Sequence, residues 1–132
     1  MKKIVLLSGV IGFSVMCFAF MPDGKKPWNA PAASASKANP QKGAESISNG
    51  KTLYAKHCQS CHGKTGLGDG TKASELKTEP GDFSKAKFHA QSDGALFYKI
   101  SEGRDDMPSF KKKMPEANDI WDVVNFVRTM KK

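Results

Sequence analysis

Apolar residues recur at helical spacing in three stretches of the chain, and no stretch shows a convincing strand pattern. These stretches predict helices over about residues 45–57, 93–102 and 116–130. In the third stretch, apolar side chains fall on one face at Ile120, Val123, Val124, Val127 and Met130. The hydrophobic pattern therefore predicts an all-α fold.

Residues at the ends of these stretches support the predicted boundaries. Ser92 or Asp93 is suited to cap the start of the second helix, because a short polar side chain there accepts from a free backbone N–H. Gly103 is placed to end that helix, and Pro115 suits the first turn of the third.

The first helix carries a stripe that includes a glycine. Its members follow one another at spacings of three and four, at Ile47, Gly50, Tyr54, Cys58 and Cys61. Gly50 is a poor helix former, so we predict that it lets another helix cross closely. Fraying of the helix near its N-terminus is the alternative explanation.

The chain opens with a methionine and two lysines, followed by an uncharged and mostly apolar run over residues 4–21. A basic start before an apolar run is typical of a secretory signal, but the run also approaches the length that spans a bilayer. Residues 1–21 are therefore predicted to be a signal peptide or an N-terminal membrane anchor. A lipoprotein signal is disfavoured, because Met16 rather than a small residue precedes Cys17.

The composition changes over residues 22–44. Prolines interrupt a run rich in Ala, Ser, Lys and Gly, and no apolar periodicity survives, so we predict a flexible linker. Trp28 is its only aromatic residue and fits either a membrane interface or a packing site. Residues 45–132 remain as one domain of about 88 residues, which is small for a self-sufficient hydrophobic core.

The formal net charge of +8 is concentrated near the N-terminus. Residues 1–44 hold six lysines and one aspartate, which account for most of the excess. Because an exported chain does not routinely meet DNA, we predict no nucleic-acid partner. The excess positive charge therefore indicates no function by itself, and candidate functional residues are sought in the domain at residues 45–132.

The most specific chemical signal is the string CQSCH, from Cys58 to His62. Two cysteines three positions apart, followed by a histidine, form the attachment sequence of c-type haem. Residues three apart share one face of a helical turn, so each thiol can form a thioether with one vinyl group of the porphyrin. His62 then supplies an axial imidazole to the iron. A buried haem would also complete the core of so small a domain.

Three other chemistries use a pair of cysteines. A zinc site needs four ligands, usually including a second pair, whereas the only further histidines are His57 and His89. A thioredoxin-like redox pair sits in a βαβ pattern, and this sequence shows none. A structural disulfide stays open in an oxidising compartment.

The motif and its flanks resemble a class I c-type cytochrome of the small bacterial monohaem type, also seen as a domain of terminal-oxidase subunits. The similarity covers residues 46–132. Its matching strings are GKTLY at 50–54, CQSCHG at 58–63, GDG at 68–70, PGDF at 80–83, MPSF at 107–110 and the last helix. The resemblance implies a small cytochrome c fold, with three to five helices wrapped around one covalently bound haem c per chain.

The resemblance also implies the second iron ligand. Met107 lies in a short loop after a helix, as in the family, so His62 and Met107 are the predicted axial ligands. Met114 stands where relatives have an apolar residue, and we expect it in the core. A site ligated by His89, or left open, is the alternative; otherwise His57 and His89 are expected at the surface.

In this family a backbone carbonyl near residue 71 accepts the Nδ1 proton of the ligand histidine. Thr71 stands where relatives often have proline. A carbonyl needs no proline, so this orienting hydrogen bond is expected to survive here.

The implied function is single-electron transfer in a periplasmic respiratory chain, without enzymatic turnover because both axial positions are filled. The implied partners are membrane respiratory complexes such as a quinol-oxidising complex or a terminal oxidase, met by a soluble chain or one anchored through residues 4–21. The alternative is a haem sensor or peroxidase-like protein with a displaceable methionine. Lys111, Lys112 and Lys113 form either a solvated turn or a basic docking rim.

Overall fold

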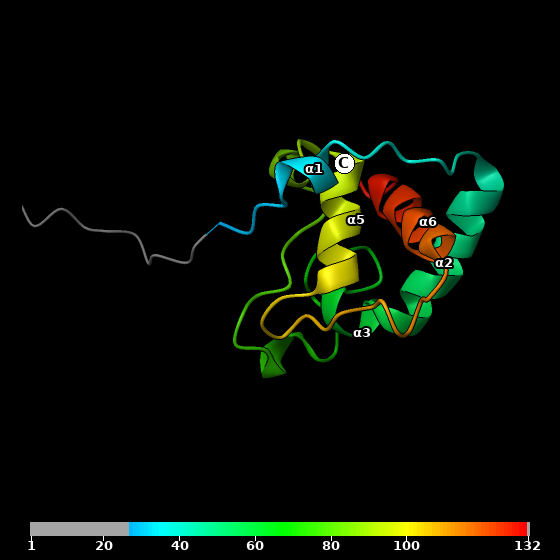
Figure 1. The fold of residues 1–132 in the computed structure, drawn as a ribbon. Coiled ribbons are helices and arrows are strands. Elements are labelled where there is room, and N and C mark those ends of the chain that lie inside the picture. The colour runs from blue at the N-terminus through cyan, green and yellow to red at the C-terminus, as the bar shows by residue number, and fades with distance from the viewer. Residues whose placement is uncertain (1–26, 132) are drawn as a thin grey trace, which may run out of the picture.

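The computed structural model, which describes residues 27–131, forms six α-helices and one 3₁₀-helix (Figure 1). They are α1 (Ala32–Ala35), α2 (Ala44–His57), α3 (Gln59–His62), the 3₁₀-helix η1 (Ala73–Glu75), α4 (Ala86–His89), α5 (Asp93–Glu102) and α6 (Ala117–Arg128). Residues 27–131 contain no strand, and their one isolated β-bridge joins Arg104 to Met107. The all-α prediction is confirmed.

The three longer helices α2, α5 and α6 lie where the hydrophobic pattern places them. At the start of α5 the Ser92 hydroxyl accepts from the Ala95 N–H at 3.2 Å, and Gly103 ends the helix with a φ of 69°. Pro115 lies just ahead of α6 rather than in its first turn, because that helix begins at Ala117. The one-turn helices were not predicted, since a single turn is too short to show periodicity.

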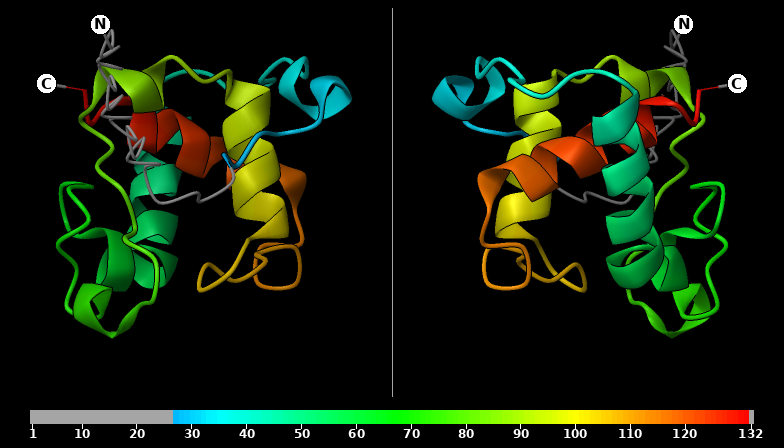
Figure 2. Two further views of the ribbon diagram at one scale, coloured as in Figure 1. Left: turned by 90° about the vertical axis from the view of Figure 1, so that its left-hand side faces the viewer. Right: turned by 90° about the vertical axis from the view of Figure 1, so that its right-hand side faces the viewer.

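Gly50 lets α2 and α6 cross in close contact (Figures 1 and 2). A β-carbon at Gly50 would lie 1.9 Å from the carbonyl oxygen of Asp122 and 3.0 Å from Cβ of Phe126. Any side chain would therefore push the two helices apart. The prediction of a close crossing is confirmed, and the fraying alternative is wrong because Gly50 lies inside α2.

The buried face of α2 differs by one position from the predicted stripe. Ile47 is 37% exposed, whereas Ser46, Gly50 and Tyr54 are buried. Ser46 is tolerated there because its hydroxyl donates to the Asp122 carboxylate at 2.5 Å. Ser46, Gly50 and Tyr54, which follow one another four residues apart, form the buried face of α2. The predicted stripe was wrong at its first position, because it began at the apolar Ile47 instead of Ser46.

A single hydrophobic core forms where α2, α5 and α6 meet. Its most deeply buried side chains are Tyr54, Met114, Val123 and Val124, each less than 2% exposed. Trp121 of α6 stacks on Phe97 of α5, with ring centroids 4.2 Å apart. The ring of Tyr54 also meets that of Phe126 across the α2–α6 crossing, at 5.3 Å.

Residues 27–41, which we call the strap, lie on the surface of the domain beside α5 (Figure 2). Composition predicts a flexible linker over residues 22–44, but the described part of that segment makes defined hydrogen bonds to α5 and α6. The leader predicted at residues 1–21 lies outside the described residues. In the part that is described, no helix has the length and apolar character needed to cross a membrane.

Candidate functional site

The CQSCH string folds as a tight turn between α2 and the loop that follows. The α2 helix ends at His57, and the N–H of the next residue, Cys58, donates to the Tyr54 carbonyl at 2.8 Å. A new turn, α3, then begins, and the His62 N–H donates to the Cys58 carbonyl at 2.9 Å. Because Cys58 and His62 are four residues apart on this turn, their side chains lie on the same side of it.

The loop after the string folds back on α3 and fixes its position. The N–H groups of Gly68, Gly70 and Lys72 donate to the carbonyls of His62, Cys61 and Ser60, at 2.9, 3.2 and 2.8 Å. Each of these carbonyls lies near the end of α3 and would otherwise be unsatisfied. The Tyr54 hydroxyl adds a fourth bond, donated to the Gly63 carbonyl at 2.7 Å.

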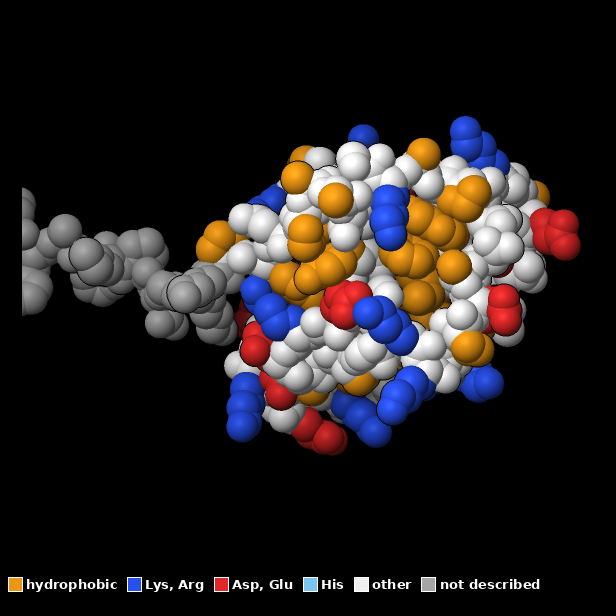
Figure 3. Space-filling model, viewed as in Figure 1, with side chains coloured by type: hydrophobic (Ala, Val, Ile, Leu, Met, Phe, Trp, Pro, Cys, Tyr) orange, Lys and Arg blue, Asp and Glu red, His pale blue; other side chains and the backbone are white. Residues whose placement is uncertain are grey.

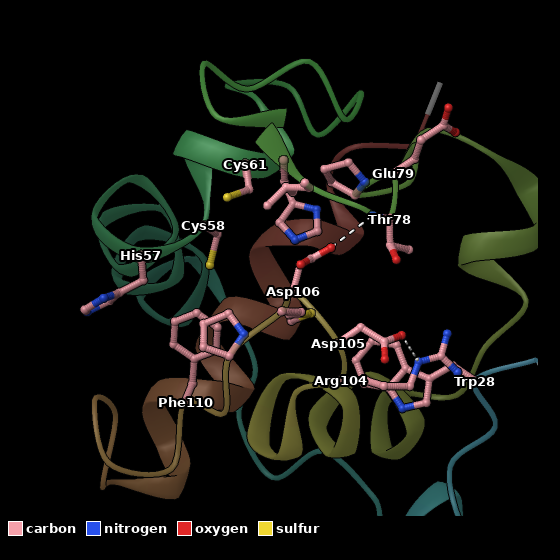
Figure 4. A pocket seen from close by; sticks show the side chains of 15 residues that line it. Trp28, His57, Cys58, Cys61, Thr78, Glu79, Arg104, Asp105, Asp106 and Phe110 are labelled. Atoms are coloured by element: carbon pink, nitrogen blue, oxygen red, sulfur yellow. Dashed lines mark hydrogen bonds and ion pairs between the residues drawn. The ribbon is translucent and has the colours of Figure 1, made fainter. Parts of the chain in front are cut away.

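Two cavities lie beside this turn, with volumes of about 190 Å³ and 180 Å³, and Figure 4 shows the side chains that line the first. Each is several times the roughly 30 Å³ that one water molecule occupies in the liquid. Four side chains line both cavities: Trp28, Cys58, His62 and Met107. Cys61 lines the first cavity only. The structure therefore brings together all four residues predicted to hold the haem, from the junction of α2 and α3, from α3 and from the loop after α5.

The two cavities differ in the chemistry of their walls. The second is lined by apolar side chains of the core, including Leu96, Ile100 and Val123. The first opens to a polar lip, where the Thr78 N–H donates to the Asp106 carboxylate at 3.0 Å (Figure 4). An apolar interior with a polar rim suits a large hydrophobic group that carries a few polar substituents.

Burial sets the protonation states of the two central groups. It raises the pKa of the Cys58 thiol to about 12, with a smaller effect from Cys61. A buried protonated thiol is a poor nucleophile at neutral pH, which argues against thioredoxin-like chemistry. Burial also lowers the pKa of His62 to about 4. His62 is therefore neutral at pH 7, and neutral imidazole is the form that binds a metal.

The backbone carbonyl that affects the protonation of His62 is that of Pro80 rather than that of Thr71. The Pro80 backbone raises the pKa of His62 as a hydrogen-bond partner would, in opposition to burial. Nδ1 is buried and has no well-formed hydrogen bond within residues 27–131. The expectation of a carbonyl at Thr71 is thus wrong, because the PGDF segment, and not the loop at 68–71, passes beside the ring: Phe83 lies 4.6 Å from His62, centroid to centroid.

The two candidate methionines have distinct environments. Met107 is half-buried and lines both cavities, whereas Met114 is 1% exposed within the core and lines neither. His57 lines the first cavity but its ring points away from it in Figure 4. His89 lines neither cavity; it is half-buried, and its Nε2 atom has no hydrogen-bond partner among the described residues.

Residues 45–127 match the family model for cytochrome c oxidase, cbb3-type, subunit III. The chain belongs to this family of c-type cytochromes. It is 32% identical to cytochrome c6 of Alaria esculenta over 83 residues, which are 63% of this chain and 90% of that protein. The family match at residues 45–127 includes both cysteines of the string.

Solved structures agree with this assignment. The c-type cytochrome KustC0563 superposes with a TM-score of 0.56 at 32% identity, over 63% of this chain and 98% of that one. A chain of the reducing HAO-like protein complex Kustc0457/Kustc0458 of Kuenenia stuttgartiensis superposes with a TM-score of 0.65 at 27% identity. That match covers 72% of this chain but only 48% of the other, so this cytochrome spans about half of that relative's length.

Membership in the family defines the cofactor and the general role. The cytochrome carries covalently bound haem c and is an electron carrier rather than an enzyme. The cavities fit such a group, because they combine apolar walls, a cysteine pair and a neutral imidazole. No group of three or more His, Cys, Asp or Glu that could hold a metal ion occurs in residues 27–131, so the zinc hypothesis gains no support.

One lining residue had no role assigned by the sequence. Trp28 lies in the predicted linker, outside the region that matches the family, yet it lines both cavities. Its signal in the sequence was a single aromatic residue in a run of small and polar residues.

Proposed function

We propose that this cytochrome is a single-electron carrier of a periplasmic respiratory chain, with haem attached through Cys58 and Cys61 and ligated by His62 and Met107. The observation that carries the proposal is that Cys58, His62 and Met107 line both cavities while Cys61 lines the first. When bound, the haem iron supplies the ferrous–ferric couple. The chain's residues hold that group, orient it and limit its contact with water.

Each proposed residue contributes through its position. Cys58 and Cys61 would fix the ring to the α2–α3 turn, which four hydrogen bonds from Tyr54 and the following loop already hold in place. His62 presents a neutral imidazole, and Met107 presents a thioether that favours ferrous iron. With both axial positions filled, a substrate has no iron site to occupy.

The apolar walls tune the same couple. Leu96 and Ile100 of α5 and Val123 of α6 are each no more than 9% exposed and line the second cavity. A low-dielectric surround disfavours the extra charge of the ferric state and so raises the reduction potential. These side chains also keep water from the buried side of the site.

A haem sensor or peroxidase-like function is the second candidate. It is favoured by the position of Met107, which lies in a loop rather than in a helix and follows two residues with positive φ angles, Gly103 (69°) and Asp105 (52°). Displacement of Met107 would need only this loop to move. The two candidates therefore differ in how firmly the loop holds the thioether.

Carbon monoxide distinguishes the carrier from the sensor. We expect the ferrous protein to show no spectral change under carbon monoxide at neutral pH, because Met107 occupies the sixth position. The ferric protein should show the weak far-red band of a methionine–iron bond. Rapid carbon monoxide binding by the folded protein, without that band, would instead establish an open or displaceable site.

Partners and location are part of the same proposal. Its support is the name of the matching family, an oxidase subunit, together with the apolar run at residues 4–21. We propose membrane respiratory complexes as donor and acceptor, such as a quinol-oxidising complex or a terminal oxidase. Cell fractionation should find the haem protein in the periplasm or on the periplasmic face of the inner membrane; recovery from the cytoplasm would refute this location.

The lysine run gives a modest docking effect. Lys111, Lys112 and Lys113 are exposed, but Lys111 pairs with Glu102 at 2.6 Å. On the face of the molecule drawn in Figure 3, acidic side chains lie among the basic ones along the lower edge. If the run steers an acidic partner, the electron-transfer rate should fall as salt rises. Changing all three lysines to glutamine should then flatten the salt dependence.

Stopped-flow kinetics with the native redox partner, over a range of ionic strength, measures this effect. A matched control changes three exposed lysines that line neither cavity, Lys42, Lys51 and Lys131, to glutamine. Equal salt slopes for the two triple variants would show that Lys111, Lys112 and Lys113 form an ordinary solvated turn.

A further inference from the structure

Trp28 of the strap lines the two cavities that would hold the haem, which we call the haem crevice. It is half-buried, and it shares both cavities with Cys58, His62 and Met107. Figure 4 shows its indole at the rim, beside Arg104 and Asp105. The family match begins only at residue 45, so Trp28 lies outside the residues that match the family model.

The strap packs against α5 at Gly94, a residue without a side chain. A β-carbon at Gly94 would lie 2.3 Å from the carbonyl oxygen of Ser34 and 2.8 Å from that of Lys37. The Ser92 hydroxyl donates to the Ala35 carbonyl at 2.6 Å. The backbone of α1 therefore packs directly against the backbone of α5, which only a glycine permits.

A second attachment ties the strap to α6. The Asn39 amide donates to Oδ1 of Asn125 at 2.8 Å, and the Asn125 amide donates to the Gln41 carbonyl at 3.0 Å. The Asn125 amide also donates to the Ser46 hydroxyl of α2 at 2.7 Å. Asn125 thus joins the strap to both helices of the central crossing.

The position of the indole is set by two cations. Cζ of Arg104 lies 4.9 Å from the ring centroid of Trp28, and Nζ of Lys99 lies 5.5 Å from it. Both distances fall within the range of cation–π attraction. Lys99 comes from α5, and Arg104 pairs through its backbone with Met107, accepting and donating at 3.0 and 2.8 Å. The indole therefore sits on the same loop that carries the proposed thioether ligand.

We infer that the strap is a cover of the haem crevice, and that Trp28 is a positioning residue that packs at the haem edge and holds the Met107 loop closed. This inference rests on the proposed ligation by Met107. The indole excludes water from the side of the crevice on which Met107 lies, and its contact with Arg104 restrains the loop. Loss of the indole should increase the fraction of molecules in which the thioether leaves the iron.

The consequence is a change in apparent affinity for an external ligand. Imidazole binds ferric iron only when the thioether is off, so its apparent affinity scales with the population of the open form. For Trp28→Ala we expect imidazole to bind on the order of tenfold more tightly than to wild type. The reduction potential should fall as well, because water reaches the haem edge. Trp28→Phe, which keeps an aromatic ring, should recover most of both properties.

A second variant, Gly94→Ala, tests the packing of the strap on α5 at a residue that lines neither cavity. In an ordinary helix interior, Gly→Ala is stabilising, but Gly94→Ala should push the strap off α5. Hydrogen exchange of the full-length holoprotein should then be faster at Ser34 and Ala35, whose amides bond within the strap, and unchanged in α2. Imidazole affinity should rise as it does for Trp28→Ala.

The outcomes separate this inference from the proposed function. If wild type lacks the methionine–iron band and binds imidazole freely, the ligation by Met107 is wrong. If wild type shows the band, but Trp28→Ala has the same imidazole affinity and the same reduction potential as wild type, then Trp28 does not position the loop. If Gly94→Ala leaves strap exchange unchanged, the strap is not seated on α5 as described. Either of these last two results, for Trp28→Ala or for Gly94→Ala, would overturn the inference.

Discussion

Replacing both Cys58 and Cys61 with serine is expected to give a haem-free chain that is largely unfolded. Without the cofactor, a cavity of about 180 Å³ would remain in the apolar core. At roughly 24 cal/mol per Å³, an empty cavity of that size destabilises a fold by up to about 4 kcal/mol. Since small domains have a total stability of only about 5–15 kcal/mol, the loss is a large part of the whole.

Acid-acetone extraction and far-ultraviolet circular dichroism measure these two effects. Wild type should keep its haem in the protein precipitate, and the double variant should show neither haem nor the helical signal. Ser60→Ala is the matched control, because Ser60 lies between the two cysteines, is exposed and lines neither cavity. A well-folded, haem-free double variant would show that the domain does not depend on its cofactor.

Met107→Ala is expected to lower the reduction potential and to open the iron to external ligands. Thioether ligation favours ferrous iron, so its loss favours the ferric state. Axial ligands shift haem potentials over a range of roughly 0.8 V, and we expect a fall on the order of 100 mV. The far-red ferric band should disappear, and carbon monoxide should bind the ferrous form.

Met114→Leu is the control for this prediction. Met114 is 1% exposed, packs in the core and lines neither cavity. A swap of similar volume in a core usually costs less than about 1.5 kcal/mol, so the spectrum and potential should match those of wild type. A larger change for Met114→Leu than for Met107→Ala would mean that the ligand had been assigned to the wrong methionine.

The sequence predicted those parts of the fold that depend on side-chain periodicity. The stripe on α6, the cap at Ser92 and the crossing at Gly50 each left a local pattern of residue types. The CQSCH string predicts a haem site on its own, and the structure places its cysteines and its histidine on the walls of the cavities. The choice of Met107 followed from the resemblance to the family, and the structure places Met107 on the walls of the same cavities.

The strap was not predictable, because its contacts leave little trace in the residue types. It is held by backbone carbonyls against Gly94, by Ser92 and by Asn125, and none of these contacts requires an apolar residue in the strap. A run of Ala, Ser and Pro therefore has the composition of a free linker while it lies against the domain. The carbonyl at Pro80 was missed for a similar reason, since any residue supplies one.

The most direct test of the central claim is a redox titration of the purified full-length protein, followed by its visible spectrum. An electron carrier with one haem should follow a single one-electron curve, with a slope of about 59 mV per tenfold change in the ferrous–ferric ratio. The curve should be the same in the reductive and oxidative directions, and the far-red methionine–iron band should vanish with the same midpoint. A titration that fits no single reversible one-electron step, or a band that is absent from the fully ferric protein, would contradict the account.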